Sequence, residues 1–218
     1  MPDIHPTAII EDGAAVAADC VIGPYCVIGG GVTLSEGVVT ASHVVIEGDV
    51  EIGARTKIGA FSAIGGPAQH LRASQAEPGK AVIGADCILR EHVTINAGML
   101  KADRATRVGN RCFLMTGSHV AHDCSVDDDV IITNQGTLAG HVHVGQGAII
   151  GGICAIHQHV RIGEYSFVGG MTGVEFDVIP FGMVLGNRAR LEGLNIIGLK
   201  RRGVSRADIQ ELRAAYKR

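Results

Sequence analysis

The chain has few aromatic residues and no excess of either charge. Its 218 residues include no tryptophan, three tyrosines and five phenylalanines, so aromatic clusters cannot dominate its core. Its 19 basic and 22 acidic residues give a net charge of −3. This balance argues against a general nucleic-acid binder, because that class carries a basic excess. The core must therefore be built from aliphatic and small residues.

Long apolar runs are missing as well. The longest one, near residues 148–156, is much shorter than the roughly 20 residues that a membrane-spanning helix requires. Residues 1–5 lack the basic and apolar regions of a secretory signal. We therefore expect a cytoplasmic protein whose six cysteines are reduced.

An aliphatic residue recurs every six positions along most of the chain. Of 25 such positions, 24 are aliphatic and one is threonine, and the residue two before each is always Ala, Cys, Val, Thr, Ser or Gly. Side chains two apart in a strand share a face, so each hexad sends one large and one small residue inward. Short strands that turn every six residues build a solenoid of parallel strands. The 25 positions are Ile10, Val16, Ile22, Ile28, Leu34, Thr40, Ile46, Ile52, Ile58, Ile64, Ile83, Leu89, Ile95, Val108, Leu114, Val120, Val126, Ile132, Leu138, Val144, Ile150, Ile156, Ile162, Val168 and Val174.

Two further features belong to this repeat. Glycine often follows the aliphatic residue, as at Gly23, Gly53 and Gly145, where we expect a sharp corner to need it. All six cysteines fall in the small inward column, so we expect them to be core residues.

Breaks in the repeat define the organisation of the chain. The pattern stops at residues 66–81 and 98–105, which we predict to be loops inserted at corners. It fades after Val174, and Pro180 marks the exit. We predict a solenoid over residues 1–180 and a C-terminal extension over 181–218, with Ser205 capping one helix that begins near residue 206.

Six histidines crowd between residues 119 and 159. A coil of three hexads, or 18 residues, stacks Gly140 on His122, and it places Asp123, His141 and His159 in the neighbouring column. The step does not distinguish outward positions from corner positions. Imidazoles gathered on an outer edge suit acid–base chemistry near neutral pH.

These motifs resemble a known family. The hexads resemble those of the hexapeptide-repeat acyltransferases, which implies an all-β solenoid, a left-handed parallel β-helix, with a short helical C-terminal tail. The segment GSHVAHDC at 117–124 resembles a core motif of the acyl-carrier-protein-dependent UDP-N-acetylglucosamine O-acyltransferases, which catalyse the first step of lipid A synthesis. Further matches in the same order are HPTA at 5–8, IGP at 22–24, SHVV at 42–45, LAGHV at 138–142, IHQ at 156–158 and GLKRRG at 198–203.

The resemblance implies a role for each matching residue. His122 would be the general base for the sugar 3-hydroxyl, Asp123 would orient it, and the Gly140 N–H would stabilise the oxyanion. Phe167 and Gly170 would set the acyl-chain length. The substrate-binding residues would be Gln69, Arg72, Asn96, His119, His141, His157, Gln158, Asn195, Arg201 and Arg202.

The resemblance also implies the partners. The acyl group would arrive on the phosphopantetheine of an acyl carrier protein, and the acceptor would be a UDP-sugar. Neither a metal nor another cofactor is expected. A homotrimer with sites between subunits is implied, because an exposed histidine edge cannot exclude water alone.

Departures from the family pattern keep alternatives open. His70, Arg72 and Asn96 stand where the family usually has Asp, Lys and His, and the relatives continue with more C-terminal helices. The acceptor could instead be a 3-amino UDP-sugar or another nucleotide sugar. A γ-type carbonic anhydrase, with three histidines on zinc, and a catalytically silent paralogue are further alternatives. We predict that His143 and His159 are surface residues.

Overall fold

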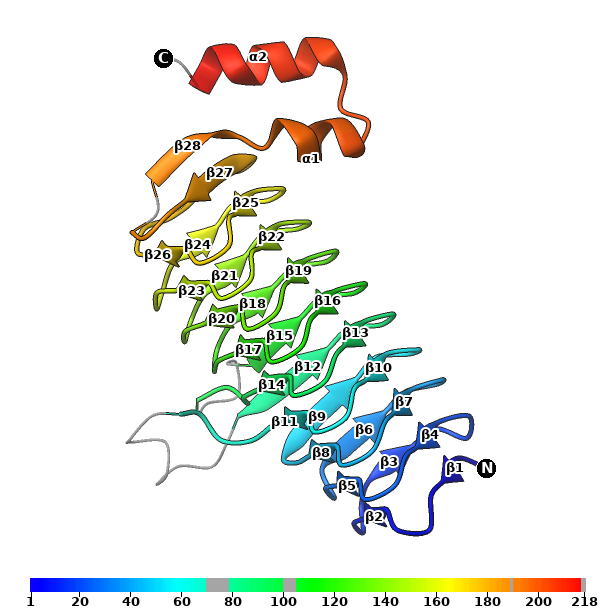
Figure 1. Ribbon diagram of the computed structural model, residues 1–218. Coiled ribbons are helices and arrows are strands. Elements are labelled where there is room, and N and C mark those ends of the chain that lie inside the picture. Colours follow the sequence, from blue (N-terminus) through cyan, green and yellow to red (C-terminus); the bar gives the residue numbers. More distant parts are fainter. Residues whose placement is uncertain (70–78, 100–104, 189, 217–218) are drawn as a thin grey trace.

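The chain winds into a prism of stacked coils with a helical cap at its C-terminal end (Figure 1). The computed structural model describes residues 1–69, 79–99, 105–188 and 190–216. Strands from successive coils pair in parallel at an 18-residue offset, as in Asp3 with Val21. Three such sheets form the three walls. The left-handed parallel β-helix predicted from the sequence is confirmed.

Each wall is one sheet. The 11-stranded sheet contains β1 (Asp3–Ile4), β4 (Val21–Ile22), β7 (Val39–Thr40), β10 (Lys57–Ile58), β13 (Ile88–Leu89), β16 (Phe113–Leu114), β19 (Ile131–Ile132), β22 (Ile149–Ile150), β25 (Phe167–Val168), β27 (Gly182–Leu185) and β28 (Arg190–Leu194). The nine-stranded sheet contains β2 (Ile9–Ile10), β5 (Val27–Ile28), β8 (Val45–Ile46), β11 (Ala63–Ile64), β14 (Thr94–Ile95), β17 (His119–Val120), β20 (Thr137–Leu138), β23 (Ala155–Ile156) and β26 (Gly173–Val174). The eight-stranded sheet contains β3 (Ala15–Val16), β6 (Val32–Leu34), β9 (Asp49–Ile52), β12 (Lys80–Ile83), β15 (Ala105–Val108), β18 (Ser125–Val126), β21 (His143–Val144) and β24 (Arg161–Ile162).

The inward columns fill the prism as the repeat predicts. Every large position is buried except Ile10 and Val16, which lie in the first coil and have no coil beneath them. The small column is buried from Cys20 onward. The core is therefore a regular stack of aliphatic layers.

The repeated glycines have a different cause from the one expected. Gly23 and Gly53 do not have a positive φ; the left-handed corner position is instead taken by residues such as Tyr25, with φ 59°. A Cβ at Gly23 would come within 2.5 Å of the Ala41 carbonyl oxygen in the next coil. Glycine is thus required here by close coil stacking rather than by backbone conformation.

The cysteines are buried free thiols, as expected. They also bond to the next coil, since Cys26 Sγ donates to the Ala41 carbonyl at 2.9 Å and Cys154 Sγ to the Gly169 carbonyl at 2.8 Å. Burial raises the pKa of Cys124 to about 12, so this thiol stays protonated at neutral pH. The cysteines therefore serve packing and hydrogen bonding.

The three edges of the prism have different characters. We call the edge between the nine- and eight-stranded sheets the histidine edge, because it carries His122, His141 and His159. Both insertions leave from it, after β11 and after β14. They lengthen the 18-residue step to 31 between Asp49 and Lys80, and to 25 between Lys80 and Ala105. The insertions and the histidines thus gather at one edge.

The C-terminal extension differs from the prediction of one helix. After β27 the chain turns back in the antiparallel strand β28, and two helices follow, α1 (Ile196–Arg201) and α2 (Arg206–Tyr216). The start of α2 matches the expected position. The six-residue α1 was missed because it is too short for an apolar period. Among the described helices, none has the length and apolar character to cross a bilayer.

Candidate active site

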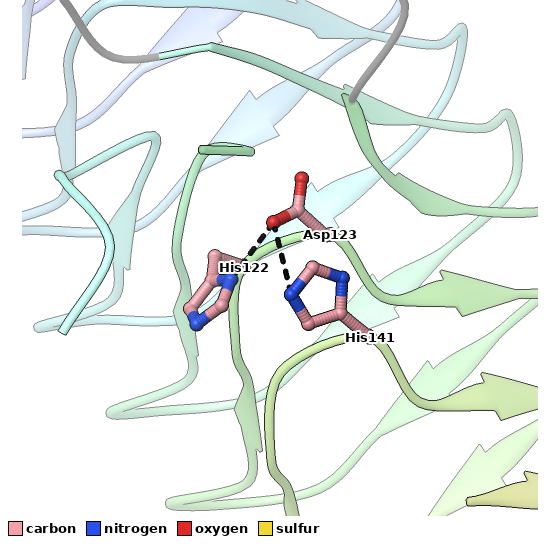
Figure 2. A group of neighbouring side chains, drawn as sticks. All are labelled: His122, Asp123 and His141. Atoms are coloured by element: carbon pink, nitrogen blue, oxygen red, sulfur yellow. Dashed lines mark hydrogen bonds and ion pairs between the residues drawn. The ribbon is translucent and has the colours of Figure 1, made fainter. Parts of the chain in front are cut away.

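His122 and Asp123 form a buried pair in the corner between β17 and β18. The His122 Nδ1 lies 2.9 Å from the Asp123 Oδ2, and the two side chains are only 7% and 4% exposed. Figure 2 shows the imidazole ring beside the carboxylate. Since an ionised carboxylate only accepts hydrogen bonds, Nδ1 carries the proton and Nε2 holds the lone pair of the neutral ring. This tautomer makes Nε2 the basic atom.

Asp123 is held in place from several sides. Its Oδ1 accepts a hydrogen bond from the Met99 N–H at 3.1 Å, and its own N–H donates to Thr106 Oγ1 at 2.9 Å. Its φ of 59° is left-handed, a conformation that Asp tolerates better than most residues. The second insertion, through Met99, therefore helps to fix the carboxylate.

Gly140 lies against the His122 ring, one coil further on. A Cβ at Gly140 would come within 2.5 Å of His122 Cε1 and 2.6 Å of Nε2, so only glycine fits. Its carbonyl accepts from the His159 N–H at 3.1 Å, whereas its own N–H has no acceptor among the described residues. The backbone of Gly140 thus lies against the side of the ring that carries the basic nitrogen.

Other histidines surround this pair. His141 Nε2 lies 3.7 Å from Asp123 Oδ2, and its ring meets the His122 ring edge-on, with centroids 5.1 Å apart. The His119 Nδ1 and the Thr94 Oγ1 share a hydrogen bond of 2.7 Å. Burial, and secondly the proximity of His122, lowers the pKa of His119. This favours neutral His119.

The remaining residues predicted for this site follow strands of the nine-stranded sheet and so lie along the histidine edge. Asn96 is buried and donates from Nδ2 to the Pro67 carbonyl at 3.0 Å, while its buried Oδ1 has no hydrogen-bond donor among the described residues. His157 and Gln158 are exposed in the corner after β23, and Gln69 is exposed at the start of the first insertion. Arg72 lies outside the described residues.

The residues predicted for the nucleotide end lie elsewhere in the chain. Arg202 donates to the Gly147 carbonyl at 3.0 Å and stacks over the Tyr165 ring at 4.3 Å, at the edge between the eight- and eleven-stranded sheets. Asn195 caps α1 by accepting from the Gly198 N–H at 2.9 Å. Arg201 is exposed in α1. One chain therefore does not bring these residues to the histidine edge.

The residues predicted to measure the acyl chain lie on a third part of the surface. Phe167 is half-buried on β25, and Gly170 is exposed in the corner between β25 and β26. A Cβ at Gly170 would meet nothing closer than the Gly152 carbonyl at 3.5 Å. The position has room for a larger side chain.

Comparisons with known proteins match this architecture. Sequence profiles described as "Udp N-acetylglucosamine O-acyltransferase; Domain 2" and "Bacterial transferase hexapeptide (six repeats)" match residues 177–218 and 2–36. An acyl-[acyl-carrier-protein]–UDP-N-acetylglucosamine O-acyltransferase of Anaeromyxobacter dehalogenans is 49% identical, over 98% of this chain and 83% of the relative. The one from Agrobacterium fabrum is 44% identical over 98% and 79%.

The chain belongs to the UDP-N-acetylglucosamine O-acyltransferase family. Solved structures agree. The Moraxella catarrhalis O-acyltransferase superposes with a TM-score of 0.95 at 40% identity, over 98% of this chain and 83% of that one. The Francisella novicida acyltransferase gives 0.95 at 33% identity, over 98% and 78%. The resemblance found in the motifs is confirmed.

Within this acyltransferase site, one group of side chains could also reach a metal ion. His122, Asp123 and His141 offer ligand atoms that all lie within 4.8 Å of one another (Figure 2). Two imidazoles and a carboxylate are ligand types that zinc accepts. Both rings also face the same carboxylate oxygen, with His122 Nδ1 at 2.9 Å and His141 Nε2 at 3.7 Å from Asp123 Oδ2.

His159, predicted to be a surface residue, is exposed, and it stacks on His141 with ring centroids 4.6 Å apart. The 18-residue step places both residues in one column. His143, also predicted to be a surface residue, pairs with Asp127 at 3.1 Å.

Proposed function

We propose that this chain transfers a (3-hydroxy)acyl group from acyl carrier protein to the 3-hydroxyl of UDP-N-acetylglucosamine. Its relatives are named acyl-[acyl-carrier-protein]–UDP-N-acetylglucosamine O-acyltransferases. The observation that carries the proposal is the buried His122–Asp123 pair with the backbone of Gly140 packed against the His122 ring. A base and an adjacent backbone donor are what acyl transfer requires. We propose the cytoplasm as the place of action, because acyl carrier protein is found there.

Each residue has one step in the proposed mechanism. His122 Nε2 removes the proton of the sugar hydroxyl as its oxygen attacks the thioester carbonyl carbon. The Gly140 N–H donates to the oxyanion that forms, and Asp123 stabilises the imidazolium. Collapse of the intermediate breaks the carbon–sulfur bond, and His122 returns the proton to the departing phosphopantetheine thiolate. The products are an ester and a free thiol, with no cofactor and no covalent enzyme intermediate.

One observation favours a second acceptor. Within the described part of the chain, the buried Asn96 Oδ1 has no hydrogen-bond donor, and such an acceptor is satisfied by a donor from a ligand. A 3-amino sugar keeps an N–H after His122 has taken the other proton, whereas a 3-hydroxyl does not. The test offers UDP-N-acetylglucosamine and its 3-amino analogue to the same enzyme with 3-hydroxyacyl carrier protein. Ester formation supports the main proposal, and amide formation alone moves the function to the amine.

The active site is proposed to form between subunits of a homotrimer. Support comes from the separation of the two halves: His122 lies at the histidine edge, whereas Arg202 is fixed against Tyr165 at a different edge. Co-expressed His122→Ala and Arg201→Ala chains test this. If sites lie between chains, mixed trimers contain some intact sites and recover activity that neither variant has alone. Absence of recovery in verified mixed trimers would contradict shared sites.

A further inference from the structure

We infer that His159 is a positioning residue, which holds His141 against the Asp123 carboxylate and thereby keeps the His122–Asp123 pair in order. This inference rests on the proposed function. His159 is the third member of a ladder along the histidine edge, in which Asp123, His141 and His159 are each 18 residues apart.

The backbone makes this ladder rigid. His141 and His159 share the left-handed corner conformation, with φ of 62° and 69°. Their N–H groups donate to the carbonyls of His122 and Gly140, both at 3.1 Å. The two rings therefore leave the edge in the same direction, one coil apart.

The rings fill the space between coils. Their centroids are 4.6 Å apart and their planes differ by 14°, a separation close to the spacing of about 4.8 Å between strands. His141 thus has His159 on one face. The His141 ring is nearly perpendicular to the His122 ring, with an interplanar angle of 88°. The His141 Nε2 lies 3.7 Å from Asp123 Oδ2.

Loss of His159 would open one side of this arrangement. The His141 side chain is already 20% exposed, so removing the ring that covers it lets it rotate toward water. Asp123 would then lose one of the groups that surround it, and the base would be held less firmly. The expected loss of kcat is about three- to ten-fold, which corresponds to about 0.65–1.4 kcal/mol of transition-state stabilisation and lies within the range that stacked aromatic pairs contribute.

The chain offers a matched control at another edge. His92 has a φ of 58° and stacks on Phe61 at 5.2 Å and 8°, within the row of exposed rings Tyr25, His43, Phe61 and His92. This row contains none of the proposed site residues. His92→Ala therefore removes an equivalent stacked imidazole without touching the site.

The experiment compares His159→Ala, His159→Phe and His92→Ala in the acyl-transfer assay, with melting temperatures measured in parallel. We expect His159→Ala to lower kcat about three- to ten-fold with a smaller change in KM, His159→Phe to restore it, and His92→Ala to match wild type. Equal melting temperatures for the two alanine variants would exclude a general loss of stability. Wild-type activity in His159→Ala would overturn the inference.

A double-mutant cycle tests whether His159 acts through His141. In a His141→Ala background, His159→Ala should change kcat no further, because its target is gone. The same fold-loss in both backgrounds would overturn the positioning role. If wild type itself shows no transfer, the proposed function fails, and the rotation of His141 in a crystal structure of His159→Ala still decides whether His159 positions it.

Discussion

Gly140→Ala should inactivate the enzyme without unfolding it. The added methyl would lie 2.5 Å from His122 Cε1 and 2.6 Å from Nε2. Carbon atoms in favourable contact are about 3.5–4.0 Å apart, so the ring must retreat by about 1 Å. Its hydrogen bond of 2.9 Å to Asp123 cannot survive that shift unchanged.

The cost of such a shift can be stated as a rate. A displacement of about 1 Å in a reacting group costs on the order of 10²-fold, which corresponds to about 2.7 kcal/mol of transition-state stabilisation. Stability should change little, because the φ of Gly140 is not in the left-handed region and alanine is conformationally acceptable there. We expect kcat/KM to fall about 100-fold while the melting temperature stays within about 4 °C.

Gly152→Ala is the matched control. Gly152 occupies the same corner position at a different edge, and its Cβ would meet nothing closer than the Asn134 carbonyl at 3.4 Å. It controls for the effect of a corner glycine-to-alanine change on folding, and it should retain the wild-type melting temperature. Full activity in Gly140→Ala, measured as acyl transfer under saturating donor, would refute the claim that the ring of His122 must lie against Gly140.

Three further predictions concern the site and the core. Asp123→Asn should lower kcat about 10²–10⁴-fold, because the amide donates to the His122 Nδ1 and moves the imidazole proton to Nε2. Steady-state kinetics measure this loss, and an unchanged kcat would remove the carboxylate from the mechanism. Cys154→Ala should lower the free energy of unfolding by about 1–3 kcal/mol, because the Gly169 carbonyl loses its hydrogen-bond donor. In urea melts, Cys154→Ser should recover most of this free energy. Equal losses for both variants would argue against the hydrogen bond. His119 has a lowered pKa in the folded protein, so on acidification the unfolded state binds the proton first, and stability is lost as the pH falls through about 6.5 toward the folded pKa. In thermal melts from pH 7 to 5, the melting temperature of His119→Gln should fall less than that of wild type. An identical fall in both proteins would contradict this.

The sequence predicted the fold well because the fold is periodic. A six-residue period and a small inward column determine the coil. The same period, counted along the chain, pairs Gly140 with His122, and the close contact between the two residues agrees with that pairing. Handedness and residue roles came from the resemblance rather than from the period.

What the sequence missed is local and non-periodic. The stacking of Arg202 on Tyr165 joins residues from the extension and the prism, which no repeat relates. The cause of the regular spacing of glycines, close coil contact, depends on the distance between neighbouring backbones. The lack of a donor to the Asn96 Oδ1 among the described residues follows from where its amide turns, which a sequence does not record.

The most direct test of the account is acyl transfer by the full chain with and without its base. 3-Hydroxyacyl carrier protein and UDP-N-acetylglucosamine are incubated with wild type and with His122→Ala, and the product is identified by mass spectrometry. The account predicts a 3-O-acyl product whose rate of formation falls about 10²–10⁴-fold in the variant. Equal rates in a folded His122→Ala protein would contradict it.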